Sequence, residues 1–227
     1  MEDEVAKHGK EIYATLKSEH KTPGEKIKDI LIEIFIIVFA VTLSIWLHGW
    51  SERNHQQTEA KEFLTDISED LGKDIKSMAD QKSGLSDMLA SYTRILKLSP
   101  KELDTVTNFS INFSLSTFKA SVGDYEGFKS SGKIGYIENK ELKKLILEYY
   151  QESLATLDDT YKYQYSKHLE VWEMINALGD QNPLSNKIFR SKIIVDAQIT
   201  QALLNAIDET EKEATALQNK IQIELKK

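Results

Sequence analysis

The sequence contains no cysteine among its 227 residues. Disulfides, zinc fingers and thiol catalysis are therefore excluded, although this absence does not identify a compartment. The length suits one domain of ordinary size together with an attachment segment.

The sequence also lacks a basic stripe. Its formal net charge is −7, and residues 1–28 carry six lysines and six acidic residues, so the remainder carries the whole −7. We expect no nucleic-acid partner, because binding to phosphates requires clustered Lys and Arg side chains.

Catalytic and metal-binding motifs are missing as well. The five histidines form no His-x-x-x-His pair, and the acidic runs at 66–74 and 158–159 lack the glycine and spacing of a calcium loop. We interpret these runs as solvated helix faces. The sequence predicts no catalytic, cofactor-binding or metal-binding residue, and therefore a protein that is not an enzyme.

One stretch, GFKSSGKI from Gly127 to Ile134, comes close to a phosphate-binding loop. Gly127, Gly132 and Lys133 match the pattern. Ile134, however, stands where Ser or Thr would hold magnesium, and no buried strand precedes the stretch. We expect a corner between helices instead, with Gly132 in the left-handed conformation that ends a helix and Asn139 capping the next helix.

What the sequence does contain is a long apolar run, ILIEIFIIVFAVTLSIWLHGW, from Ile30 to Trp50. As a helix this run spans about 31 Å at about 1.5 Å per residue, which is close to the hydrocarbon thickness of a bilayer. A cleaved signal peptide is one alternative, but 29 residues precede the run and no small-x-small site follows it. A buried core helix is the other, and the stretch 34–41 has no polar face.

The flanks of the run indicate its orientation. Trp46 and Trp50 lie at one end, where indoles favour the headgroup layer, and Lys26 and Lys28 precede the other end. Four lysines lie on the N-terminal side, against two basic residues on the C-terminal side. The positive-inside rule then places the N-terminus in the cytoplasm.

These assignments divide the chain into three parts. We expect a cytoplasmic tail at 1–28, one transmembrane helix at 29–50 and an extracytoplasmic domain at 51–227. The expected location is the inner (plasma) membrane of a bacterium, with the domain in the periplasm where the cell has two membranes.

Small and polar residues share one face of the predicted membrane helix, namely Glu33, Ala40, Ser44 and His48. Such residues permit close approach and hydrogen bonding, so this stripe favours self-association or docking to another membrane protein. The alternative is that Glu33 and His48 simply reach the two headgroup layers.

Beyond the run, apolar residues recur at helical spacing. We expect long helices at 51–98, 139–178 and 193–225 and a short one after Pro100. Residues 105–118 alternate apolar and polar side chains, which predicts an extended connection. Long helices that bury a common apolar seam predict an all-α fold, in which one transmembrane helix precedes an elongated antiparallel helical bundle.

Three stretches carry a resemblance to known proteins: EIFIIVFAVTLSIWLHGWSE, EFLTDISEDLGKDI and FKSSGKIGYIENKELKKLILEYY. Together they resemble a family of uncharacterised bacterial single-pass membrane proteins, whose N-terminal membrane helix ends in a Trp-rich turn before a mostly helical outer region. The resemblance covers most of residues 30–150. At His48–Gly49 the sequence departs from the family, which often has Asn there. The resemblance implies a topology and no reaction.

The sequence therefore favours a non-enzymatic subunit of a cell-envelope assembly. It would bind the lipid bilayer and other membrane or envelope proteins, as a homo- or hetero-oligomer and without a cofactor. The alternative is an extracytoplasmic ligand-sensing bundle that signals through a partner, with a pocket lined by Tyr161, Tyr165 and Trp172.

Overall fold

The computed structural model describes residues 7, 9–10, 13–14, 22–105, 111, 118–179 and 181–227. Within these ranges all regular structure is helical, so the predicted all-α class is confirmed. The chain divides into two compact units, Met1–Thr58 and Glu59–Lys227. The extended connection predicted at 105–118 lies mostly outside the described residues.

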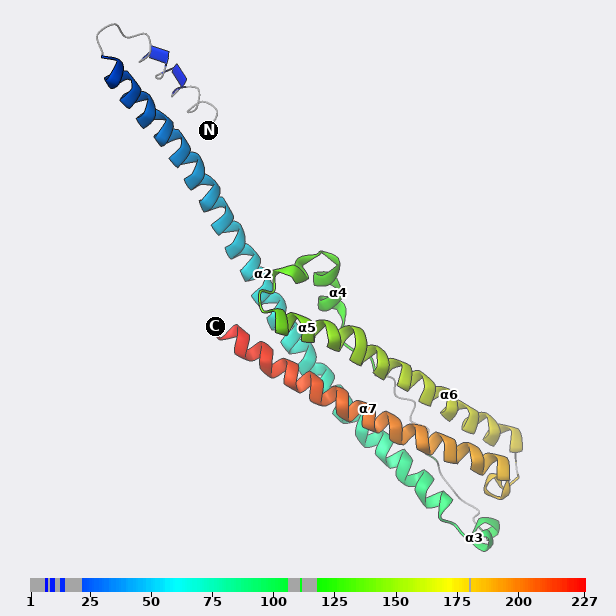
Figure 1. The fold of residues 1–227 in the computed structure, drawn as a ribbon. Coiled ribbons are helices and arrows are strands. Elements are labelled where there is room, and N and C mark those ends of the chain that lie inside the picture. The colour runs from blue at the N-terminus through cyan, green and yellow to red at the C-terminus, as the bar shows by residue number, and fades with distance from the viewer. Residues whose placement is uncertain are drawn as a thin grey trace. The chain divides into compact units, whose positions relative to one another are not determined.

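The longest helix is α2, Pro23–Leu96, and it contributes residues to both units (Figure 1). Its start is fixed by local chemistry, because the Thr22 amide donates to Glu25 Oε2 at 2.9 Å and the Thr22 hydroxyl donates to the same oxygen at 2.8 Å. The Glu25 amide donates in return to Thr22 Oγ1 at 3.4 Å, which completes a capping box, and Pro23 suits the first helical position.

The other helices whose bounds the structure describes belong to the unit 59–227. They are α3 Pro100–Thr105, α4 Gly123–Ser130, the 3-10 turn η1 Lys133–Tyr136, α5 Lys140–Glu148, the π-helical turn η2 Tyr149–Ser153, α6 Leu154–Leu178, the 3-10 turn η3 Pro183–Ser185 and α7 Lys187–Leu225. The helix predicted at 139–178 is thus present as α5, η2 and α6 in direct succession. Asn139 caps its start by accepting the Leu142 amide at 3.1 Å, and Gly179, with φ of 54°, ends it.

Helices α6 and α7 pack side by side, joined by the short η3 turn (Figure 1). One hydrophobic cluster takes buried side chains from α2, α4, α5, α6 and α7. On α2 the buried Ile67, Leu71 and Met78 recur at helical spacing. Each such side chain contributes about 1.5–3 kcal/mol when it leaves water, so the cluster holds this unit together.

The interpretation of residues 66–74 as a wholly solvated face is wrong. Asp70 and Asp74 are buried, and the Asp74 carboxylate accepts the Ser121 amide, with N–O distances of 3.0 and 3.2 Å. Burial raises the pKa of Asp74, and the Ser121 hydrogen bonds oppose that rise. The second run fits its interpretation, because Asp158 and Asp159 are exposed and pair with Lys162.

Candidate functional site

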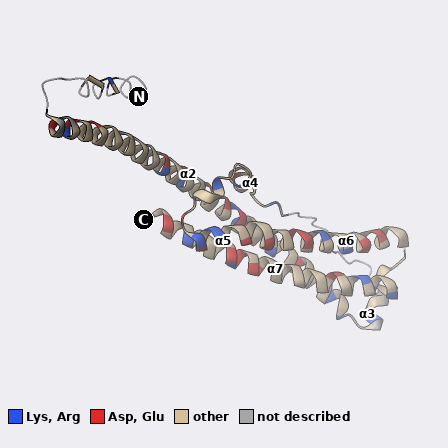
Figure 2. Ribbon diagram, turned by 45° about the horizontal axis from the view of Figure 1, so that its top comes forward, with Lys and Arg blue, Asp and Glu red and all other residues tan. Residues whose placement is uncertain are grey.

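The N-terminal part of α2 exposes its apolar side chains. This helix is long and apolar enough to cross a membrane, it is the one such helix among the residues described, and none of its apolar window is buried. Trp46 is 63% exposed, and Figure 2 shows this part of the ribbon almost without charged residues. A core helix of a soluble protein would bury such a window, so this surface requires a covering of lipid or protein.

Hydroxyl groups within the apolar window are satisfied inside the helix. Thr42 Oγ1 donates to the Val38 carbonyl at 2.7 Å, and Ser44 Oγ donates to the Ala40 carbonyl at 2.8 Å. Lipid hydrocarbon offers no hydrogen-bond partner, so internal pairing of this kind is what a membrane-spanning helix requires.

The structure places the predicted stripe along α2. Ala40, Ser44 and His48 are exposed, and Glu33 is half-buried. The predicted anchors Trp46, Trp50 and Lys28 are exposed, while the side chain of Lys26 lies outside the described residues. The roles of these residues in a membrane stay predictions.

The stretch GFKSSGKI forms the predicted corner. Gly127 lies within α4, and Gly132, with φ of 76°, separates α4 from η1. Lys133 Nζ lies 3.0 Å from Glu59 Oε1 of α2. The glycines therefore shape a helix–turn, and the lysine that would reach a phosphate makes an ion pair instead.

A buried polar cluster, formed by Tyr92, Gln164, His168 and Asp196, was not predicted. The Tyr92 hydroxyl of α2 donates to Asp196 Oδ2 of α7, and His168 Nδ1 of α6 lies 2.9 Å from that same oxygen. Gln164 Nε2 donates to Asp196 Oδ1 at 3.4 Å. All four side chains are buried, with Asp196 at 0% and His168 at 1% exposure.

The acceptor of this cluster is the Asp196 side chain. Burial, and then the charge of Asp196, raise the pKa of Tyr92, so its hydroxyl keeps its proton and remains a donor. Since that proton points to Asp196, His168 Nδ1 must also carry hydrogen for its contact with the carboxylate to be attractive. The cluster thus gathers donors from α2 and α6 around one buried acceptor of α7.

The described residues contain no group of three or more His, Cys, Asp or Glu side chains that could hold a metal ion. One Glu-x-x-His pair occurs, Glu52 and His55, and Glu52 accepts a hydrogen bond from Gln56 Nε2 at 3.0 Å. A di-iron bundle uses two such pairs together with further glutamates, which this part of the helix does not gather.

The tyrosines of α5 to α6 divide into two groups. Tyr149, Tyr150 and Tyr161 are buried, as core packing predicts, and burial raises the pKa of each. Tyr165 and Trp172 are more than 40% exposed. The ligand-sensing pocket at Tyr161, Tyr165 and Trp172 stays a prediction.

One cavity of about 460 Å³ opens beside Lys133, between α2 and α4, and it carries the acidic residues Glu62, Asp66 and Asp124. A groove of about 410 Å³ runs between α7 and the stretch from Leu145 to Ser153. Both lie within the unit 59–227.

Comparisons of the chain with protein-family models, with curated proteins and with solved structures gave no match.

Proposed function

We propose that this protein is a non-enzymatic single-pass membrane protein that serves as a structural or interaction subunit of a cell-envelope assembly. The observation that carries this proposal is the apolar window of α2, which stays wholly unburied while the other long helices bury their apolar faces. The N-terminus lies in the cytoplasm and residues 51–227 lie in the periplasm or outside the cell, as the lysines before the window favour.

The extracytoplasmic part is an elongated antiparallel helical bundle with coiled-coil-like packing. Its support is the side-by-side packing of α6 and α7 and the cluster that ties both to α2 through Tyr92, His168 and Asp196. A buried polar group of this kind favours one register of neighbouring helices, since any slip would leave Asp196 without donors.

The membrane helix associates through the stripe of Glu33, Ala40, Ser44 and His48. The small side chains of Ala40 and Ser44 let another helix approach closely, whereas Phe39 projects a bulky ring. The partner is a second copy of this chain or another membrane protein of the envelope.

Disulfide crosslinking in native membranes tests this function. The chain has no cysteine of its own, so Ala40→Cys and Phe39→Cys each introduce one thiol. We expect an oxidised adduct, either a dimer or a heterologous species found by mass analysis, with Ala40→Cys and not with Phe39→Cys. Equal adduct in both variants, or none in either, contradicts the proposed subunit role.

A ligand-sensing bundle is the second candidate function. The groove between α5–η2 and α7 favours it, because it offers a cavity inside the helical unit. Thermal stabilisation of a pure monomer by a small molecule, with no partner in mild-detergent purification, would support sensing over assembly.

A further inference from the structure

We propose that the exposed face of α7 between Ile188 and Asn205 binds the same face of a second copy of this chain, as a parallel two-stranded coiled coil. This pairing deepens the assembly role proposed above. It rests on that role in one respect, because a common membrane anchor brings the two copies together. The face itself lies in the unit 59–227 and is separate from the stripe of the membrane helix.

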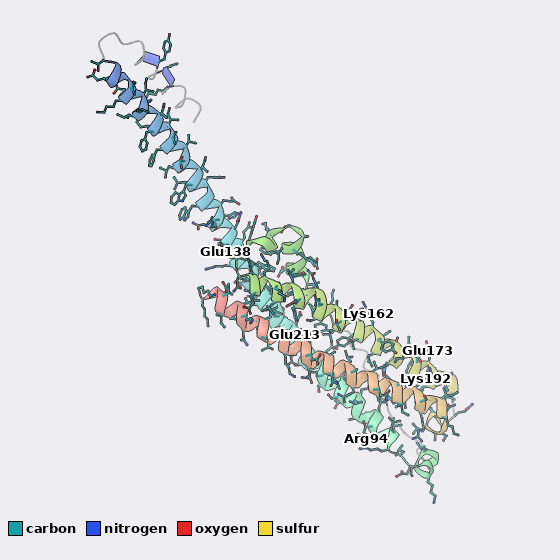
Figure 3. The ribbon with its side chains drawn as sticks, in the orientation of Figure 1. Arg94, Glu138, Lys162, Glu173, Lys192 and Glu213 are labelled. Atoms are coloured by element: carbon teal, nitrogen blue, oxygen red, sulfur yellow. The ribbon has the colours of Figure 1, made fainter. Side chains whose placement is uncertain are left out.

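The face is uncharged, which is unusual on this protein. Every residue of α7 is described, and its eight exposed residues in this stretch are Ile188, Ser191, Ile194, Val195, Gln198, Gln201, Ala202 and Asn205. Beyond this stretch the same helix exposes Glu209, Lys212 and Glu213, the last of which Figure 3 labels. A chain with a net charge of −7 repels its own copies, so two copies approach most easily where neither carries charge.

Six of these exposed residues follow a heptad repeat. Ile188, Val195 and Ala202 are seven residues apart, and Ser191, Gln198 and Asn205 each follow one of them by three residues. This alternation of three and four residues is that of positions a and d in a coiled coil. The buried face of α7, which includes Ile193, Thr200 and Ile207, lies on nearly the opposite side of the helix at 3.6 residues per turn. Helix α7 therefore has one seam inside its own unit and a second seam that is exposed.

The composition of the exposed seam favours a parallel pair. In a parallel pair each position faces itself, so Ile188 meets Ile188, Val195 meets Val195, and the polar residues meet one another. In an antiparallel pair position a faces position d, and every apolar residue of the seam would oppose a polar one. β-Branched residues at position a, here Ile188 and Val195, also favour two strands.

The residues that flank the exposed seam agree with this pairing. In a parallel pair Ile194 of one copy lies beside Ile199 of the other, which extends the apolar contact. Lys192, labelled in Figure 3, is already paired with Glu170 of α6 at 2.8 Å, so its charge is balanced within its own copy. At the other end Asp208 of one copy would lie beside Glu213 of the other, and repulsion between these two acids ends the seam there.

The polar residues of the exposed seam determine its register. Gln201 Nε2 donates to Asn205 Oδ1 at 3.1 Å within the helix. An amide side chain both donates and accepts, so Asn205 can still donate to the Asn205 of the second copy. A shift of the two helices that places Asn205 against Val195 or Ala202 removes this hydrogen bond. Polar residues at such positions specify one register at a cost in affinity.

The membrane anchor compensates for this modest affinity. The exposed seam extends about 26 Å at about 1.5 Å per residue, and a small interface of this kind holds two free proteins only transiently. Two chains that span the same bilayer meet at a raised effective concentration, so a weak contact is sufficient.

Disulfide crosslinking of the purified full chain in lipid vesicles, at a low ratio of protein to lipid, tests the pairing. The chain has no cysteine, so Val195→Cys introduces one thiol at the middle of the exposed seam. We expect a mild oxidant to give a disulfide-linked dimer. Tyr163→Cys on α6 is the control, since Tyr163 is 55% exposed and Val195 only 40%. The control should give at least about 10-fold less dimer, because a disulfide forms only where two Cα atoms come within about 7 Å.

A mixture of two variants tests the direction of the helices. Ile188→Cys and Asn205→Cys, one of them carrying a size tag, should each form dimers of the same variant and no mixed dimer. A mixed dimer is the product of an antiparallel pair and would overturn the parallel arrangement.

A charge variant completes the test. In the Ile188→Cys chain, Val195→Glu together with Ala202→Glu should lower the yield of dimer at least about 10-fold, because like charges then face each other across the seam. Circular dichroism excludes unfolding as the cause, since both positions are exposed. Equal dimer from Val195→Cys and Tyr163→Cys, or no dimer from Val195→Cys in a chain that stays with the vesicles in alkaline carbonate, would overturn this pairing and leave the membrane anchor intact. Release by carbonate would contradict the anchor instead.

Discussion

The two parts of α2 differ in what their apolar residues contact. Between Ile30 and Trp50 apolar side chains surround the helix and remain exposed, whereas between Glu59 and Leu96 they occupy one face and are buried. A single helix therefore presents one part suited to lipid and another suited to packing against protein. Both parts are helical, so they differ in the burial of their apolar side chains and not in secondary structure.

The two parts also differ in their long-range hydrogen bonds. In both parts hydroxyls donate to the carbonyl four residues earlier in their own helix, as Ser44 does in the first part and Thr93 in the second. The second part adds a long-range bond, because Tyr92 donates to Asp196, which lies 104 residues away in the chain. Such long-range hydrogen bonds specify how helices pack.

The largest expected effect comes from placing charge in the first part. Val38→Arg together with Val41→Arg should cost about 5–7 kcal/mol of membrane insertion, since each arginine near the centre of a membrane helix costs about 2.5–3.5 kcal/mol. We expect the wild-type chain to remain with vesicles in alkaline carbonate and the double variant to be released.

Ile188→Arg together with Ile223→Arg is the matched control, because both isoleucines lie on α7 and are 63% exposed. This control should remain with the vesicles. Release of the wild-type chain by carbonate would contradict the membrane assignment altogether.

The next effect concerns the long-range bonds of the second part. Asp196→Ala removes the acceptor that Tyr92 and His168 share, and we expect the free energy of unfolding to fall by about 3–5 kcal/mol. Urea unfolding in detergent, followed by circular dichroism, measures this loss. Asp159→Ala is the control, since that side chain is 82% exposed and should change stability by less than about 0.5 kcal/mol.

Local chemistry is what the sequence predicts well. Ser99 caps α3 through Glu102, Asn139 caps α5, and Gly132 forms the corner after α4, all through partners within a few residues. The apolar run at Ile30–Trp50 is equally local, because its length and composition alone make it a candidate membrane span.

Long-range polar contacts could not be predicted in this way. Tyr92 and His168 are 76 residues apart, and Asp74 is satisfied by the backbone of Ser121. A signal existed at Gln164 and His168, which continue the apolar spacing of Leu157 and Tyr161 along α6. Polar residues on an apolar face indicate a buried network, although they do not name the partner on another helix.

The choice between two neighbouring leucines is also beyond the sequence. Leu203 of α7 is fully buried and Leu204 only partly. Neighbouring leucines are equally apolar, and only packing against the other helices distinguishes them.

A smaller effect separates paired from unpaired hydroxyls within the second unit. Tyr92→Phe should lower the free energy of unfolding by about 1–3 kcal/mol, because Asp196 loses a donor. Tyr150→Phe should leave it unchanged or raise it slightly, because the Tyr150 hydroxyl has no partner among the described residues. The same urea experiment measures both variants. A larger loss of unfolding free energy in Tyr150→Phe than in Tyr92→Phe would contradict a stabilising role for the hydrogen bond from Tyr92 to Asp196.

The smallest effect tests glycines along α2. A Cβ at Gly84 meets no atom within 4 Å, so Gly84→Ala should raise the free energy of unfolding by about 0.5–1 kcal/mol through helix propensity. At Gly72 the added Cβ would lie 3.1 Å from Gln218 Nε2, which donates to the Ser68 carbonyl at 2.7 Å. Gly72→Ala must therefore shift that hydrogen bond, and we expect no increase in the free energy of unfolding. Gly49→Ala, in the part suited to lipid, should leave urea unfolding unchanged because that part stays helical in detergent or bilayer. A gain at Gly49 equal to that at Gly84 would show that both parts of α2 unfold together in water.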